Sequence, residues 1–147
     1  MRTVLIYCVL ALCVAPAMAQ HQHRAPITTA LEIHPGLGSY PIITTKNPEA
    51  QTYFNQGLML LYGFNHDEAA RYFRRAAHLD PEAAMPYWGL ALAIGPNYND
   101  TAVDENRAKA SYDAVRQAVA HAPKASGREQ DYIRALAKRY PSPDAKS

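Results

Sequence analysis

The sequence predicts an all-α domain of five helices between residues 47 and 140. Residues that start and end helices recur along this region at intervals of about one helix length. Within these intervals apolar residues recur at helical spacing, so that Tyr53, Gly57 and Leu60, for example, share one stripe. The alternation of apolar and polar residues that is typical of a strand never extends beyond a few positions. These three observations favour a domain made only of helices.

Two similar runs of residues mark the starts of the first and third predicted helices. The run Asn-Pro-Glu at residues 47–49 supplies an N-cap, a proline at the first helical position and an acid in the first turn. The run Asp-Pro-Glu at residues 80–82 repeats this order. We expect the first helix to end at Gly63 and the third at Gly95, because glycine readily terminates a helix.

The other three helices begin with cap signals of a second kind. In each of them a capping residue is followed three positions later by an acid. The pairs are Asn65 and Glu68, Thr101 and Asp104, and Ser126 and Glu129. We expect the second helix to end near Leu79 and the fifth before Pro141.

An internal repeat underlies these helices. The runs at residues 47–49 and 80–82 lie about 33 residues apart, close to the 34-residue period of tetratricopeptide repeats. In the first unit, six residues occupy the positions where that repeat places its aromatic, glycine, alanine and proline residues. They are Tyr53, Gly57, Ala69, Phe73, Ala76 and Pro81. The second unit matches only with extra residues between its helices, around residues 95–104.

The chain resembles secreted bacterial tetratricopeptide-repeat proteins over residues 42–140. Residues 53–58, 62–69, 87–89 and 95–99 are similar to the opening repeats of a longer family of such proteins. The resemblance implies an α-solenoid of antiparallel helix pairs, about two and a half repeats long, that serves as a scaffold for a protein or peptide partner. Because those relatives carry more helices, the chain also fits a truncated fragment with no independent function. So short an array is expected to form a homo-oligomer or to expose apolar surface.

The family pattern also implies where a partner would bind. The first helix of each unit lines a concave groove, which makes eight residues candidate contacts. They are Gln51, Phe54, Leu58, Leu61, Tyr62, Met85, Trp88 and Leu92. We expect an aromatic groove for an apolar segment with Trp88 as its anchor. The competing interpretation is that these residues pack against the N-terminal leader or the fifth helix.

The N-terminus has the features of a cleaved signal peptide over residues 1–19. Arg2 is followed by an apolar run, and small residues at Ala17 and Ala19 precede the expected cut. The run is shorter than the roughly 20 residues that span a bilayer, so we expect a secreted or periplasmic protein without a membrane anchor after cleavage. Both cysteines lie in this segment, which leaves no disulfide in the mature chain. Residues 20–46 are predicted as an extended leader and residues 141–147 as a tail.

Composition and motifs argue against nucleic-acid binding and catalysis. Without Arg2 the chain has fourteen basic residues against thirteen acidic ones, too small an excess for binding nucleic acid. No serine has the setting of a nucleophile, and the paired carboxylates lie in first helical turns, where the helix dipole explains them. We therefore predict no enzymatic activity and no cofactor.

Metal binding remains an alternative at one place. His21 and His23, near the expected mature N-terminus, suit weak binding of copper or nickel, although such pairs more often belong to a polar tail. A metal-handling protein is thus the alternative function. Asn97, Asn99 and Asp100 offer oxygen ligands for calcium, but the loop lacks the acidic series of a dedicated site and is better explained as a turn.

Overall fold

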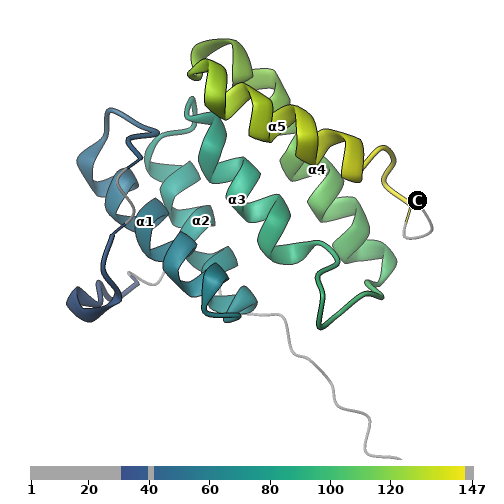
Figure 1. Ribbon diagram of the computed structural model, residues 1–147, viewed down its shortest axis with the longest axis horizontal. Helices are drawn as coiled ribbons and strands as arrows, with labels where there is room; N and C mark the ends of the chain where they lie inside the picture. The colour runs from purple at the N-terminus through teal and green to yellow at the C-terminus, as the bar shows by residue number, and fades with distance from the viewer. Residues whose placement is uncertain (1–30, 40–41, 145–147) are drawn as a thin grey trace, which may run out of the picture.

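The computed structural model describes residues 31–39 and 42–144, which form helices and connecting loops (Figure 1). The α-helices are α1 (Pro48–Tyr62), α2 (His66–Leu79), α3 (Ala84–Ile94), α4 (Glu105–His121) and α5 (Gly127–Arg139). Two short 3-10 helices, η1 (Pro35–Leu37) and η2 (Ala122–Lys124), precede α1 and α5. This part of the chain contains no strand, which confirms the predicted all-α class. The predicted signal peptide lies outside the described residues.

Each helix packs against the next one along the chain (Figure 1). In addition α3 contacts both α1 and α5, so it lies at the centre of the arrangement. Because only residues 63–65 join α1 to α2, and residues 80–83 join α2 to α3, these neighbours run antiparallel. Within the described residues, none of the helices combines the length and the apolar character needed to cross a bilayer.

Local capping signals explain where three of the helices begin. The side chain of Asn47 accepts hydrogen bonds from the first turn of α1, and Asp104 accepts one at 2.8 Å from the N–H of Arg107 in α4. Ser126 and Glu129 form a reciprocal capping box at the start of α5. The predicted caps of α1 and α5 are confirmed, since each satisfies N–H groups that have no partner within the helix. The predicted cap of the fourth helix, Thr101, is wrong: α4 begins three residues later, because Asp104 itself accepts from the first turn.

The start of α2 differs in its detail from the prediction. Asn65 does occupy the N-cap position, but its side chain makes no capping hydrogen bond. Glu68 forms an ion pair with Arg71 at 2.7 Å, on the surface of the same helix. The predicted capping box is therefore wrong, because the carboxylate has a stronger charged partner within reach.

The third helix begins three residues later than predicted. Asp80 is the C-cap of α2 and not the cap of α3, Pro81 lies in a turn, and Ala83 is the N-cap residue of α3. Pro86 gives the reason. It falls in the first turn of α3, where a helix needs no N–H donor, whereas a helix that began at Pro81 would place Pro86 where its ring clashes with the preceding turn.

The end of α1 places a phenylalanine in a backbone conformation that favours glycine. The N–H of Asn65 donates to the C=O of Leu60 at 2.9 Å, and that of Phe64 donates to Leu61 at 3.1 Å. This pair of hydrogen bonds requires a left-handed backbone conformation at the first residue after the C-cap. Phe64 takes that role with φ 62°, while Gly63 has an ordinary φ of −81°. The helix ends where predicted, but the residue in the left-handed conformation is not the glycine.

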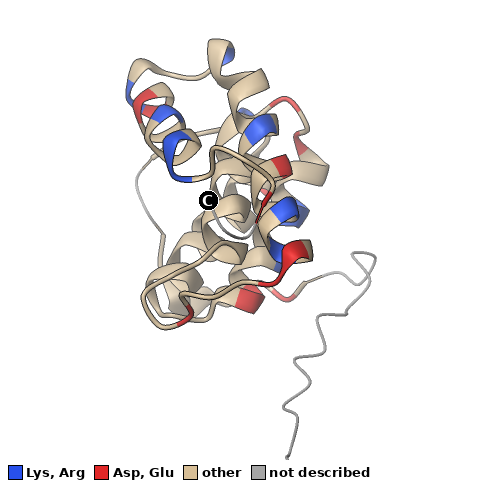
Figure 2. Cartoon of the chain, turned by 90° about the vertical axis from the view of Figure 1, so that its right-hand side faces the viewer, with Lys and Arg blue, Asp and Glu red and all other residues tan. Residues whose placement is uncertain are grey.

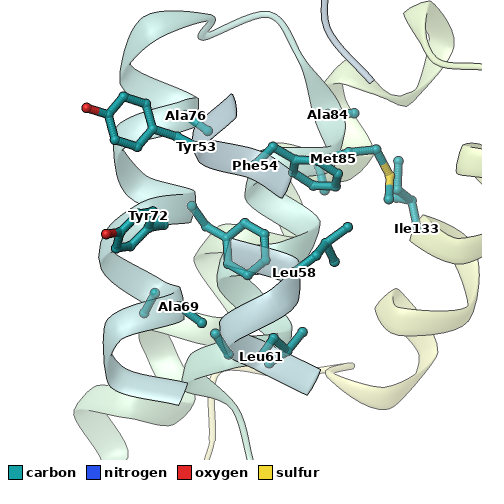
Figure 3. Packing of buried hydrophobic residues seen from close by; sticks show 14 residues of the cluster. Tyr53, Phe54, Leu58, Leu61, Ala69, Tyr72, Ala76, Ala84, Met85 and Ile133 are labelled. Atoms are coloured by element: carbon teal, nitrogen blue, oxygen red, sulfur yellow. The ribbon is translucent and has the colours of Figure 1, made fainter. Parts of the chain in front are cut away.

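The main core lies between α1, α2 and α3 (Figure 3). Phe73 of α2 lies at its centre, 5.7 Å from the ring of Phe54. A Cβ atom at Gly57 of α1 would lie 2.8 Å from the Phe73 ring, and one at Gly89 of α3 would lie closer still. Five of the six residues predicted to pack the repeat are buried, and the sixth, Pro81, is exposed after α2.

The last helix closes one side of this core. Ile133 of α5 is fully buried and lies beside Met85 in Figure 3. A second cluster joins α3, α4 and α5 through residues that include Val115, Leu136 and Tyr140. One face of α5 is therefore buried against the other helices, and its opposite face is exposed.

Candidate peptide-binding surface

Two buried tyrosines hold the leader by its main chain. The hydroxyl of Tyr53 in α1 donates to the C=O of Leu31 at 3.1 Å. The hydroxyl of Tyr72 in α2 donates to the C=O of Glu32 at 2.5 Å. Only 1% of Tyr72 is exposed, and burial raises the pKa of its hydroxyl, so it stays a neutral donor.

A buried glutamine completes this contact one turn further along α1. The amide of Gln56 accepts from the N–H of His34 and donates to the C=O of the same residue, both at 3.1 Å. This is the pairing that an adjacent β-strand would offer to an extended segment. We refer to Tyr53, Gln56 and Tyr72 together as the main-chain clamp.

Gln51 of α1 binds a second part of the leader, residues 42–45, by the main chain. The amide oxygen of Gln51 accepts from the N–H of Thr44 at 2.8 Å and from that of Thr45 at 3.3 Å. Its nitrogen donates to the C=O of Ile42 at 2.9 Å. Gln51, predicted to face a partner, thus binds the chain's own leader.

Four more of the predicted groove residues lie in the core. They are Phe54, Leu58, Leu61 and Met85, and each is at most 6% exposed. They belong to one cluster with Ile133 of α5 (Figure 3). The positions of these four residues and of Gln51 agree with the alternative given above, in which the groove residues pack against the leader or the fifth helix. In this conformation they have little surface to offer a partner.

The remaining predicted contacts keep some exposed surface. Trp88 and Leu92 are half-buried, and the Trp88 ring lies 5.9 Å from that of Tyr132 in α5. Tyr62 is 63% exposed at the end of α1. Its neighbour Phe64, which the sequence did not single out, is 68% exposed. The turn between α1 and α2 therefore presents two aromatic side chains to solvent.

An open pocket of about 340 Å³ lies between α2 and α3 on another face. Arg74 and His78 of α2 line it together with Tyr87 and Leu90 of α3. Burial lowers the pKa of the Arg74 guanidinium, and the Tyr87 ring stacks on His121 at 5.6 Å. The lining is mostly apolar, which suits one side chain of a partner better than a polar ligand.

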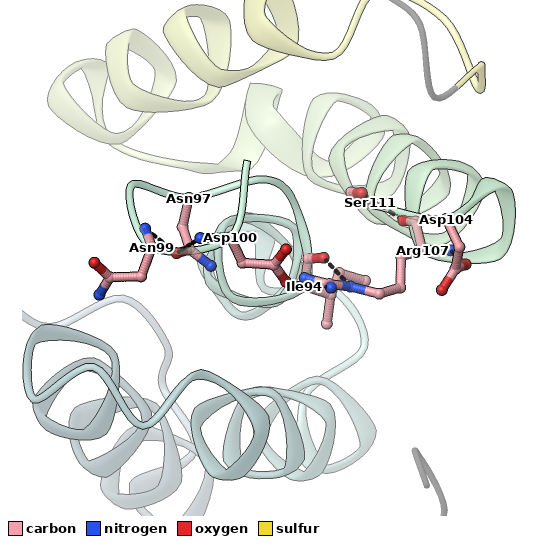
Figure 4. Close-up of polar contacts among 7 residues, drawn as sticks. All are labelled: Ile94, Asn97, Asn99, Asp100, Asp104, Arg107 and Ser111. Carbon is pink, nitrogen blue, oxygen red and sulfur yellow. Dashed lines mark hydrogen bonds and ion pairs between the residues drawn. The ribbon is translucent and has the colours of Figure 1, made fainter. Parts of the chain in front are cut away.

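The loop between α3 and α4 is held by its own polar groups (Figure 4). The side-chain oxygen of Asn97 accepts from the N–H groups of Asn99 and Asp100 at 2.9 and 3.0 Å. Arg107 pairs with Asp100 at 2.5 Å and donates to the C=O of Ile94 at 3.2 Å. These contacts use the side-chain oxygens of Asn97 and Asp100, two of the three residues considered for calcium, which favours turn chemistry at this loop.

Charge and metal ligands add no further site within the described residues. In Figure 2 basic and acidic residues are interspersed on the same helices. One surface pair is Lys124 with Glu82, and the hydrogen bond from Lys124 lowers the pKa of Glu82. The described chain holds no group of three or more His, Cys, Asp or Glu residues placed to bind a metal. His21 and His23 lie outside the described residues.

Comparison with known proteins gives no relative from which the role of this surface could be inferred. No family model, curated protein or solved structure matched the chain. The main-chain clamp was missed at the sequence level, although Gln56 among apolar residues of one helix is a signal that could have pointed to it. Nothing in the sequence marks Phe64, because glycine is the residue expected in a left-handed helix end and Gly63 stands directly before it.

Proposed function

We propose that the chain is a non-enzymatic scaffold of the tetratricopeptide-repeat type that binds a protein or peptide partner. The repeat type is supported by the use of two glycines, since Gly57 in α1 and Gly89 in α3 both face the ring of Phe73. It is also supported by the short turns that join α1, α2 and α3. Helix pairs of this kind commonly present binding surfaces along a stacked array.

The observation that carries the binding proposal is the exposure of Phe64 in a left-handed conformation. A phenylalanine there is less stable than glycine by roughly 1 kcal/mol, and burial does not offset this because 68% of the side chain is exposed. Exposed Tyr62 lies two positions away. Aromatic side chains are the usual anchors of protein interfaces, so this turn is the proposed contact for the partner.

A selection from a random-peptide display library on the full chain tests this function. Peptides selected on the wild type should lose most of their affinity for Phe64→Ala and for Tyr62→Ala. An exposed change elsewhere, Lys109→Ala on α4, is the matched control. Equal binding of the selected peptides to the wild type and to both aromatic variants would contradict the proposal.

The proposed location is the periplasm or the outside of the cell. It rests on the signal-like segment at residues 1–19 of the sequence. Expression of the full chain in a bacterium, followed by N-terminal sequencing of the soluble periplasmic fraction, should give Gln20 as the first residue. Recovery of an uncleaved chain from the cytoplasm alone would refute this location.

A further inference from the structure

The open pocket between α2 and α3 combines an apolar lining with one guanidinium group. Ala77 of α2 and Leu90 of α3 supply apolar surface, together with Pro81 in the turn between the two helices. The ring of Tyr87 adds an aromatic wall, and Arg74 adds the positive charge. A volume of about 340 Å³, with mostly apolar groups around one polar anchor, is typical of sites that bind small organic molecules.

The aromatic wall of this pocket is held in place by two contacts. The hydroxyl of Tyr87 donates to the C=O of Pro81 at 3.2 Å. Its ring stacks on the ring of His121 in α4, with an angle of 17° between the two planes. Because this wall is already ordered, a ligand that packs against it loses little affinity to the ordering of side chains.

Arg74 has no directly bound counter-charge within the described part of the chain. It is half-buried, and it makes neither a hydrogen bond nor an ion pair with any residue that the structure describes. Asp67, seven positions earlier in the sequence, attracts the guanidinium without forming an ion pair with it. The neighbouring Arg71, in contrast, pairs with Glu68 at 2.7 Å. Arg74 therefore keeps its charge and its N–H donors for a ligand.

We infer that this pocket binds a small monocarboxylic acid whose apolar body is about the size of one side chain. The carboxylate pairs with Arg74, because the planar fork of N–H donors on a guanidinium matches two carboxylate oxygens. The apolar body lies against Ala77, Tyr87 and Leu90. A monoanion fits better than a phosphate, since a second negative charge would stay unpaired beside an apolar lining. This inference does not depend on the partner proposed for the aromatic turn, which lies at the other end of α2.

Phenylpropionate, which joins one carboxylate to an aromatic body, is the probe for this site. The amide NMR signals of Ala77 and Leu90 in the isotope-labelled full chain report whether the pocket is occupied. We expect these signals to shift during a titration, with a Kd of roughly 1 mM for so small a ligand. Phenylpropanamide lacks the charge and propionate lacks the aromatic body. Each of these two compounds should bind about tenfold more weakly than the probe, or weaker still.

Substitutions of Arg74 test the charge from the side of the protein. Arg74→Met keeps much of the length of the side chain, and it should weaken the binding of phenylpropionate about tenfold or more without changing the binding of phenylpropanamide. Arg74→Lys keeps a charge but not the planar fork, so its affinity should lie between those of the wild type and the methionine variant. Arg134→Met, at an exposed position of α5, is the matched control and should bind the probe like the wild type.

The inference is overturned if phenylpropionate at roughly 10 mM, well above the expected Kd, shifts neither signal. It is also overturned if the acid and the amide bind equally well to the wild type, a comparison that needs no variant to fold. Equal binding of the probe to the wild type and to a folded Arg74→Met chain has the same meaning. Acetylated alanyl-phenylalanine presents the same groups as the end of a polypeptide. If this dipeptide bound about tenfold more tightly than phenylpropionate, the occupant would be a protein C-terminus and not a small acid.

Discussion

The ring of Phe73 in α2 lies so close to Gly89 in α3 that a Cβ atom at residue 89 would overlap with it. The same ring atoms approach Gly57 in α1, where an added Cβ would lie 2.8 Å away. One aromatic side chain thereby joins three helices. The spacing of these helices depends on the absence of a side chain at both glycines.

Gly89→Ala should destabilise the protein by about 1–3 kcal/mol, because the new methyl group forces the Phe73 ring or α3 to shift. The better helix propensity of alanine, about 1 kcal/mol, offsets only part of this loss. Urea unfolding followed by circular dichroism measures the effect. Gly127→Ala is the control, since its Cβ would meet nothing within 4 Å, and it should leave stability unchanged or slightly raised. An equal response of the two variants would show that Phe73 does not set the spacing.

Phe64→Gly should raise the stability by about 1 kcal/mol, because glycine adopts a left-handed conformation without strain. Phe64→Ala removes the same aromatic ring but keeps the strained backbone, so it should give no such gain. Thermal unfolding of both variants separates the two effects. If Phe64 is the proposed contact, both variants should also lose the selected peptides. A glycine variant no more stable than the alanine variant would argue against backbone strain at this turn.

Tyr140→Phe should be neutral or stabilising by about 1 kcal/mol. The Tyr140 hydroxyl is buried against Gly95 and has no hydrogen-bond partner among the described residues. Removing a buried, unpaired hydroxyl removes its desolvation cost while the ring continues to pack. Denaturant titration of the two proteins is the measurement. A loss above 1 kcal/mol would mean that this hydroxyl does have a partner in solution.

Stability should fall at alkaline pH. Burial raises the pKa of Tyr72, Tyr87 and Tyr140 above the ordinary value of 10.0. The folded state therefore binds more protons than the unfolded state above pH 10, so stability is complete below that pH and decreases as the pH rises further. Melting curves from pH 8 upward, with tyrosinate absorbance recorded in parallel, measure this. Tyr140→Phe should weaken the dependence, and an unchanged slope would show that Tyr140 does not contribute.

Helix boundaries were predictable where the signal is local. The caps at Asn47 and Ser126 act within four residues of their own helix, so the sequence is sufficient to place them. At the fourth helix both Thr101 and Asp104 are suitable capping residues, and the structure uses Asp104. The start of α3 was also open to prediction from Pro86, which excludes a helix that begins at Pro81. The repeated Asp-Pro-Glu run therefore has a different role in its second copy, where it joins α2 to α3.

The burial of the groove residues expected from the sequence was much less predictable. An apolar stripe shows that one face of a helix is buried, but it does not show what covers that face. Phe54 and Met85 could as well have lined an open groove as a core. The packing of Ile133, nearly 50 residues further along the chain than Met85, places them in the core.

By itself the sequence determined the all-α class, the number of helices and most of their ends, because these depend on interactions between near neighbours. Only the tertiary structure decided the rest. The contact of Tyr72 with Glu32 joins residues 40 positions apart, and the core cluster brings together Met85 and Ile133, which lie nearly 50 positions apart. Such features depend on which surfaces meet after folding. Local propensity and periodicity show which face of a helix is apolar, but they do not show which other segment covers that face.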